Sequence, residues 1–215
     1  MVIKGLLILA QTAVLLWVMA LIGCKTPLPP PPPLANSGSP EVDVLVSYLV
    51  QNSQRTTRHK PVVSKLTVPF VAWPSASFSE DCSKHLPVPT KDIPEDLIRD
   101  FCEKNSSTNR VLISGDLTNH VAALLVSDDA LGSLFAFGMP VKPDEWDKFY
   151  HRYPEAGEMT HFSRVGFNKA GDMAMVYTHT TFHWLVGGSG RVVVFEKHDH
   201  RWVILPVFWA FSVDN

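Results

Sequence analysis

A long apolar segment at the N-terminus, followed at once by a run of prolines, constrains this chain most strongly. Lys4 is the only charged residue before Lys25, and the stretch from Gly5 to Gly23 is apolar apart from Gln11 and Thr12. A basic start, an apolar stretch and a small residue at its end are the layout of a secretory signal. We therefore expect residues 1–23 to act as a signal peptide.

The end of this segment, Leu21-Ile22-Gly23-Cys24, resembles the bacterial lipobox. The resemblance implies that the thiol of Cys24 receives a lipid and that Cys24 becomes the first residue of the mature chain. It also implies a location in the bacterial cell envelope, anchored by lipid and facing the periplasm or the exterior. An uncleaved membrane-spanning helix stays open as an alternative, because 19 residues at about 1.5 Å each reach roughly 28 Å, close to the hydrocarbon thickness of a bilayer.

A proline-rich spacer, residues 24–40, separates this segment from the rest of the chain. The five consecutive prolines from Pro29 to Pro33 favour a stiff polyproline II rod, and Ala35 to Ser39 favour a flexible piece. Such a spacer would hold a domain away from a bilayer; a ligand for a proline-binding domain is the alternative. Residues 41–215 contain no internal repeat and no second low-complexity break, so we expect them to form one domain.

The charge balance excludes one class of partner. Cleavage before Cys24 would leave 18 basic and 21 acidic residues, a net charge of −3, and no basic tract of five or more residues occurs. This balance argues against nucleic acid as a partner. The expected partner is the membrane, through the lipid anchor; a protein or small-molecule partner is not specified, and no cofactor is expected.

Two cysteines besides Cys24 are present, Cys82 and Cys102. An even pair outside the cytoplasm is usually bonded, so we expect a disulfide between them. Closing a loop of this length stabilises a fold by about 3 kcal/mol on the chain-entropy model. Two buried free thiols are the alternative.

Helix start signals and apolar spacing predict three helices. Ser39-Pro40-Glu41 offers a capping hydroxyl, a proline at the first helical position and an acid, and a second helix is expected over 94–104. A third begins at Pro143, with a short helical turn before it at 128–135. The aromatic residues of the third helix recur at helical spacing: Trp146, Phe149, Tyr150 and Tyr153. We expect this stripe to pack on the sheet formed by 160–211, against Val165, Phe167, Val176 or Trp202; a ligand platform is the alternative.

The strands cluster late in the chain. Early extended segments are expected at 61–73, 111–113 and 121–126. Later ones are a hairpin of 160–168 and 172–180, a strand over 191–197 after a glycine-rich loop at 187–190, and a strand over 201–211 after a tight turn at 198–200. Sequential strands joined by short turns form an antiparallel meander. The prediction is an α+β domain, with an antiparallel meander in the C-terminal half and helices packed on one face.

The C-terminal third carries a recurring set of motifs, Trp146 with Phe149-Tyr150 and Tyr153-Pro154, then Ser163 to Asn168, Ala174 to Tyr177, Gly188 with Gly190, and Trp202. It resembles a group of uncharacterised bacterial exported domains with the pattern W-x2-FY-x2-YP, S-x-VGFN, ALVY, G-x-G and a late Trp. The chain departs from the group at Arg191-Val192, where paired aromatics are usual, and at His198-Asp199-His200, where a turn with Asp-Gly or Asn-Gly is usual. The resemblance implies a fold and an exported location and transfers no reaction.

Few residues are candidates for binding chemistry. Arg164 and Asn168 are expected on one strand face, opposite Val165 and Phe167, where they would bind an anion if the face is concave; an exposed strand face is the simpler interpretation. His179 and His183 are spaced to share a strand face and could approach His198 and His200 as metal ligands. Solvated or strand-end histidines are the simpler interpretation, so no metal is expected. The glycines at 187–190 lack the Lys-Ser/Thr and the strand-to-helix context of a phosphate loop.

Two functional hypotheses follow. The favoured one is a non-enzymatic, lipid-anchored binding or interaction domain of the bacterial envelope, with no catalytic residues. The alternative is a small hydrolase or ligand-transforming enzyme, with a site on the concave face of the sheet that uses His179, His183 or Arg164. A pocket lined by these side chains would favour the enzyme, and a filled or flat sheet face would favour the binding domain.

Overall fold

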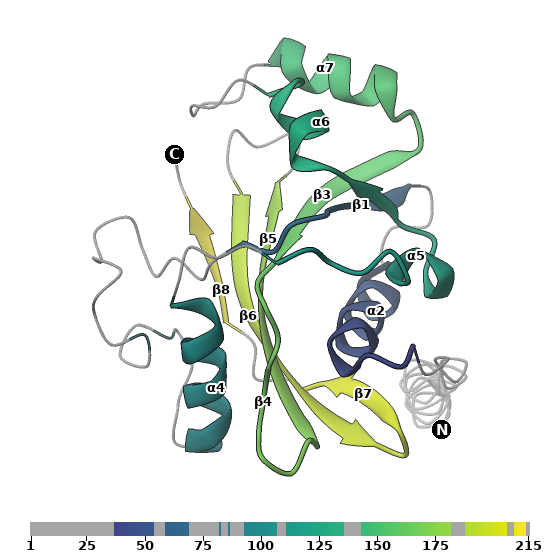
Figure 1. The fold of residues 1–215 in the computed structure, drawn as a ribbon. Helices are drawn as coiled ribbons and strands as arrows, with labels where there is room; N and C mark the ends of the chain where they lie inside the picture. The colour runs from purple at the N-terminus through teal and green to yellow at the C-terminus, as the bar shows by residue number, and fades with distance from the viewer. Residues whose placement is uncertain are drawn as a thin grey trace, which may run out of the picture. The chain divides into compact units, whose positions relative to one another are not determined.

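A mixed β-sheet with helices on both of its faces organises the described part of the chain (Figure 1). The computed structural model describes residues 37–53, 59–68, 82, 86, 93–106, 111–135, 143–181, 188–205 and 209–213. All of them belong to one compact unit, Leu34–Asn215. The predicted signal segment and most of the proline-rich spacer lie outside the described residues.

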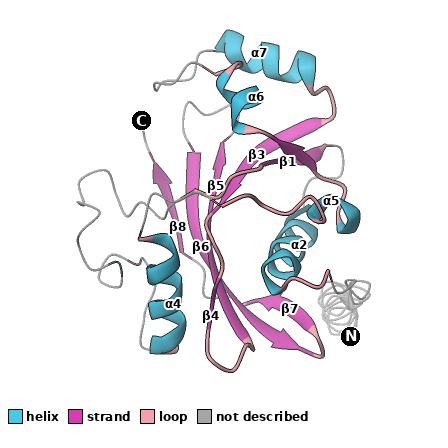
Figure 2. Cartoon of the chain, viewed as in Figure 1, coloured by secondary structure: helices cyan, strands magenta, loops and turns pink. Residues whose placement is uncertain are grey.

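In the described part of the chain, the helices all come before β3, with two strands among them, and only strands follow. Figure 2 distinguishes the helices from the strands by colour. The helices are α2 (Pro40–Ser53), α4 (Glu95–Asn105), α5 (Leu117–His120), α6 (Asp128–Gly132) and α7 (Pro143–Arg152). The strands are β1 (Lys60–Ser64), β2 (Leu124–Val126), β3 (Ala156–Phe162), β4 (Gly166–Phe167), β5 (Met173–Thr181), β6 (Gly188–His198), β7 (Arg201–Ile204) and β8 (Trp209–Val213). The three helices predicted from start signals are confirmed, and α2 begins as expected, with the Val42 amide 3.5 Å from the Ser39 hydroxyl oxygen.

The sheet has the strand order β2-β1-β3-β5-β6-β7, with β4 paired to β5 and β8 paired to β6. β1 runs parallel to both β2 and β3, whereas every pairing from β3 onward is antiparallel. The long strand β6 pairs with β8 through its first half and with β7 through its last residues. The predicted α+β class and the antiparallel C-terminal strands are therefore confirmed, and β1 and β2 add a parallel portion.

The helices lie on both faces of this sheet, whereas the sequence pattern predicted helices on one face only. α2 packs with Val176 and Val193, whereas α4 packs with the neighbouring residues Met175 and Val194 on the opposite face. The physical reason is that successive strand residues point to opposite faces. β5 and β6 both contain uninterrupted apolar runs, which are typical of strands buried on both sides.

The aromatic stripe of α7 is buried, but the predicted packing partners were wrong. Phe149 is fully buried and Trp146 nearly so, and they pack with Val62 of β1 and Met159 of β3. The residues expected to receive them, Val165, Phe167, Val176 and Trp202, pack around α2 instead. The reason is topological: the parallel strand β1 extends the sheet beyond β3, and α7, which leads directly into β3, covers that extension.

Several boundaries also differ from the sequence-based expectation. Gly188 to Gly190 belong to β6, paired with Thr181 to His179, so this part of the expected glycine-rich loop is strand. The segment 61–73 forms β1 and then an isolated bridge between Leu66 and Leu112; its residues after 68 lie outside the described part. The turn at 198–200 is confirmed, with Asp199 and His200 both at positive φ.

Candidate functional site

Asn168, one of the two predicted anion ligands, holds the β4–β5 turn. Its side-chain oxygen accepts hydrogen bonds from the backbone amides of Asp172 (3.1 Å) and Met173 (3.0 Å). Its amide nitrogen donates to the Asp172 carboxylate at 2.6 Å. An Asn side chain that satisfies its neighbours in this way stabilises a tight turn. The structure thus gives Asn168 a local structural role.

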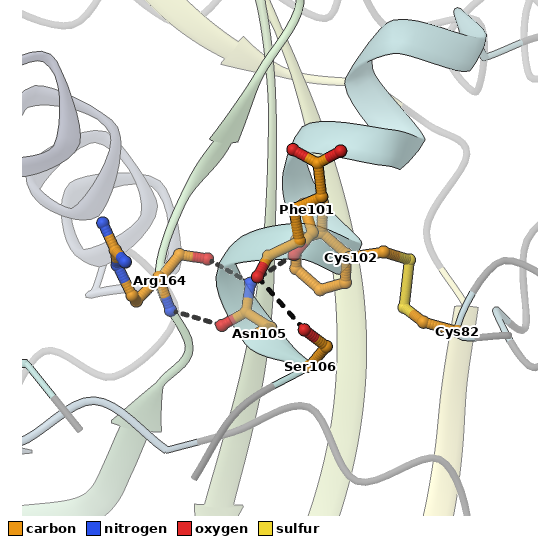
Figure 3. The surroundings of a disulfide bond; sticks show 7 residues. Cys82, Phe101, Cys102, Asn105, Ser106 and Arg164 are labelled. Carbon is orange, nitrogen blue, oxygen red and sulfur yellow. Dashed lines mark hydrogen bonds between the residues drawn. A yellow bond between two sulfur atoms is a disulfide. The ribbon is translucent and has the colours of Figure 1, made fainter. Parts of the chain in front are cut away.

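Arg164, the other predicted anion ligand, is directed toward a different helix. Its guanidinium lies 4.0 Å from the carboxylate of Glu41 in α2. Its backbone amide donates to the side-chain oxygen of Asn105 (2.9 Å), and its carbonyl accepts from the Asn105 amide nitrogen (3.0 Å), as Figure 3 shows. Arg164 and Asn168 therefore have separate structural partners.

The segment around β4 is bound to α4 by helix side chains. The Phe167 amide donates to the Asp100 carboxylate at 2.7 Å, and the Lys169 amide donates to that of Asp96 at 2.8 Å. Asp96 and Asp100 are one helical turn apart, so they share a helix face. Next to the Phe167 contact, a Cβ placed on Gly166 would lie 2.6 Å from the Cα of Phe101. Gly166 thus allows helix and strand backbones to approach closely, which explains part of the Ser163–Asn168 motif.

The predicted disulfide is present. Cys82 is bonded to Cys102 of α4, and their Cα atoms are 5.6 Å apart (Figure 3). Both cysteines pack against the apolar cluster between α4 and the sheet, which includes Leu97 and Val192. The bond therefore ties the chain at Cys82 to the helix that holds β4.

The histidines contribute one pair within the described residues. His179 of β5 lies directly across from His161 of β3, and their rings stack at 6.1 Å. Burial lowers the pKa of His179, so its imidazole is neutral near pH 7. His183 lies outside the described residues, His198 is exposed beside Glu196, and His200 occupies the turn. Among the residues that the structure describes, no group of three metal-ligating side chains converges.

A polar cluster on the α2 face of the sheet was not predicted from the sequence. We define it by its side chains from one helix and three strands: Tyr48, Glu158, Thr178, Thr180, Ser189 and Arg191. The Tyr48 hydroxyl lies 3.3 Å from that of Thr178, which fixes this face as the one toward α2. Thr178 pairs across the strands with Arg191, and Thr180 pairs with Ser189, so these side chains share the face.

Two buried polar atoms of this cluster have no hydrogen-bond partner: Nε of Arg191 and Oγ of Ser189. Such orphan groups are rare in folded proteins because each loses its hydrogen bonds to water. Arg191 and Ser189 are two residues apart in one strand, so the two groups lie on the same side of β6. The cluster therefore has donor capacity that the described residues do not use.

Electrostatics in the cluster favour a protonated tyrosine and a perturbed carboxyl group. Burial raises the pKa of Tyr48, and the hydrogen bond to Thr178 and the charge of Arg191 offset part of this rise. Burial also raises the pKa of Glu158, while the positive charge of Arg191 acts in the opposite direction. Tyr48 is thus a hydrogen-bond donor or acceptor at neutral pH and not a base.

The sequence contained a weak signal for this cluster. Arg191 immediately precedes the apolar run 192–195, and the apolar run of β5 is followed by Thr178 and Thr180 at alternating positions. A charge or hydroxyl at the end of a buried strand is common, so this pattern alone does not single out a site.

Comparisons of the whole chain give no independent assignment. Within residues 37–213, as far as they are described, no helix is long and apolar enough to cross a membrane. Comparison of the chain with protein-family models, with curated proteins and with solved structures finds no match in any of the three.

Proposed function

We propose that this protein is a lipid-anchored binding or interaction domain of the bacterial envelope, related to the exported domains that it resembles. The main support for this location is the motif Leu21-Ile22-Gly23-Cys24 at the end of the apolar segment, which a proline-rich stretch follows. A lipid on Cys24 and a stiff spacer would hold the domain at a distance from the membrane surface.

The Cys82–Cys102 disulfide supports the location. Disulfides persist in exported proteins and are rare in the reducing cytoplasm. The bond joins α4 to a segment distant in sequence and lies beside a buried apolar cluster, so it is part of the fold. A domain that contains such a bond is suited to the periplasm or the cell exterior.

The arrangement of the candidate residues supports binding over catalysis. The enzyme hypothesis placed a site on the concave face of the sheet that uses His179, His183 or Arg164, and convergence of these side chains would have favoured it. His179 lies on the face that α4 covers, because it alternates with Met175 and Tyr177, whereas Arg164 faces Glu41 of α2 on the other side of the sheet. The polar cluster instead offers hydroxyl and guanidinium donors, which suit ligand recognition.

The anchor is tested by intact-mass analysis of the membrane fraction from a bacterial host. The wild-type chain is expected to begin at Cys24 with added acyl mass. Cys24→Ala is expected to keep residues 1–23 and to lack the lipid, while Cys82→Ala, a cysteine control, is expected to keep the lipid. A mature chain that starts elsewhere, or an unlipidated wild-type protein that retains residues 1–23, would overturn the proposal.

A further inference from the structure

The polar cluster on the α2 face has the features of an unoccupied recognition site. Its two orphan groups, Arg191 Nε and Ser189 Oγ, are buried on one side of β6. Arg191 and Glu158 interact electrostatically, yet the two described side chains form no direct ion pair. A guanidinium is always charged, and its nitrogens form a planar fork of donors. Among the described residues, no acceptor lies within hydrogen-bond distance of Nε in this fork.

We propose that the polar cluster binds a small carboxylate that carries a hydrogen-bond donor on the adjacent carbon, as in an α-hydroxy or α-amino acid. The ligand carboxylate accepts from Arg191 Nε and Ser189 Oγ, and the adjacent hydroxyl or ammonium donates to Glu158. The inference rests on the proposed binding function but not on the lipid anchor.

The choice of a carboxylate follows from geometry and charge. Two unpaired donors on one side of β6 can each bind one oxygen of a carboxylate, a group that also binds arginine in a bidentate manner. Phosphate offers similar oxygen atoms, but its net charge approaches −2 near pH 7. Glu158 interacts electrostatically with both Arg191 and Tyr48, so a ligand bound at Arg191 would also lie near this acid. A second acidic charge beside Glu158 would be repelled, so the site favours a monoanion.

The adjacent donor follows from Glu158 itself. This carboxyl group is half-buried, and no hydrogen bond to its side chain is formed by the residues that the structure describes. A partly desolvated acid without a donor is unfavourable. A hydroxyl or ammonium on the ligand would supply the missing donor, and the ring of Tyr48 and the hydroxyl of Thr180 would limit the ligand to a small size.

The experiment measures the binding of acetate, glycolate, glycine and inorganic phosphate to the detergent-solubilised full chain by isothermal titration calorimetry. Glycolate or glycine is expected to bind more tightly than acetate, and phosphate more weakly than either. Glycolate carries a hydroxyl as the adjacent donor and glycine carries an ammonium group, so their relative affinities show which donor the site prefers. Binding of none of the four, or tighter binding of phosphate, would overturn the proposal.

Substitutions of Arg191 and Ser189 test whether these two side chains contact the ligand carboxylate. Arg191→Gln is expected to weaken binding of the preferred probe by at least about tenfold, as the loss of a charge-assisted hydrogen bond implies. The matched control is Arg99→Gln, at an exposed position of α4, which is expected to leave the affinity unchanged. Ser189→Ala is a smaller change that tests the same carboxylate contact if Arg191→Gln fails to fold.

Glu158→Gln is expected to reduce the preference for glycine over acetate, because a neutral amide no longer attracts an ammonium group. Equal affinities of the wild type, Arg191→Gln and Ser189→Ala would overturn the assignment of the site. If the protein instead converts glycolate or glycine into a product, the proposed binding function fails, whereas the contacts of Arg191 and Ser189 stand. The two proposals therefore fail in distinguishable ways.

Discussion

Gly166→Ala tests whether close approach of α4 to β4 determines the stability of this domain. A Cβ at this position would lie 2.6 Å from both Cα and Cβ of Phe101 and 2.7 Å from its backbone nitrogen. Ordinary van der Waals contact begins at 3.4 Å, so the helix would have to move away by about 0.8 Å. These atoms lie at the base of a helical residue and cannot turn aside as the end of a flexible side chain can.

The magnitude follows from what that movement would disturb. Overpacking of a tight contact costs about 1–3 kcal/mol. Here the shift would also stretch the 2.7 Å bond from the Phe167 amide to Asp100, beside the same contact. We therefore expect a loss of about 3 kcal/mol in the free energy of unfolding. For a domain of this size, that loss corresponds to a fall in melting temperature of about 6–12 °C.

The assay is thermal unfolding followed by circular dichroism under oxidising conditions, which keep the disulfide intact. Gly115→Ala is the matched control, because a Cβ there meets nothing within 4 Å and the residue is exposed. If Gly166→Ala melts within about 2 °C of Gly115→Ala, the helix accommodates the methyl group, and the close approach of helix and strand does not determine stability.

Two further substitutions test the core and a turn. Phe149→Ala is expected to lower the free energy of unfolding by about 3–5 kcal/mol, because this fully buried ring contacts the rings of Trp146 and Tyr153. Urea unfolding measures this loss, and a loss near zero would show that the aromatic stripe of α7 is not part of the core. His200→Gly is expected to stabilise by about 0.5–1 kcal/mol, because His200 has φ of 65° in the two-residue turn of the β6–β7 hairpin. A lower melting temperature for His200→Gly would refute this account of the turn.

The helices were predictable because their signals are local. Ser39 caps α2, and α4 and α7 each have a proline at their start and two acidic residues in their first turn. The partners of these helices were less predictable, because they depend on which strands lie next to each other. The aromatic residues of α7 show this: their burial follows from helical spacing, whereas the contact with Val62 depends on the parallel pairing of β1 with β3.

The candidate site was harder to predict, for the same physical reason. Arg164 and Asn168 were paired on the assumption of a regular strand from 160 to 168, but the residues between β3 and β4 are not strand. The polar cluster, in turn, is formed by residues as distant as Tyr48 and Arg191, which meet only when α2 docks on the paired strands β5 and β6. No local pattern encodes such a meeting.

Asp96 and Glu158 provide a last prediction, in which two acids affect stability in opposite directions. The backbone amide of Lys169, which donates to the Asp96 carboxylate at 2.8 Å, lowers the pKa of Asp96. A lowered pKa means that the ionised acid stabilises the fold above its unfolded pKa. This contribution is lost as the pH falls through the folded pKa. Asp96→Asn should therefore lower the melting temperature at pH 7, and the difference from wild type should shrink below about pH 4.

Glu158 should behave in the reverse manner. Burial raises its pKa, so its ionised form opposes folding above the folded pKa, and this cost disappears below the unfolded value. Glu158→Gln should raise the melting temperature at pH 8 and lose that advantage as the pH falls below about 4. Melting curves of both variants and the wild type across pH 3–8 decide the matter. Two differences of the same sign, or a Glu158→Gln gain that does not change with pH, would refute the assigned environment of one of the two acids. Opposite, pH-dependent differences would support the hydrogen-bonded acid on α4 and the desolvated acid beside Arg191 together.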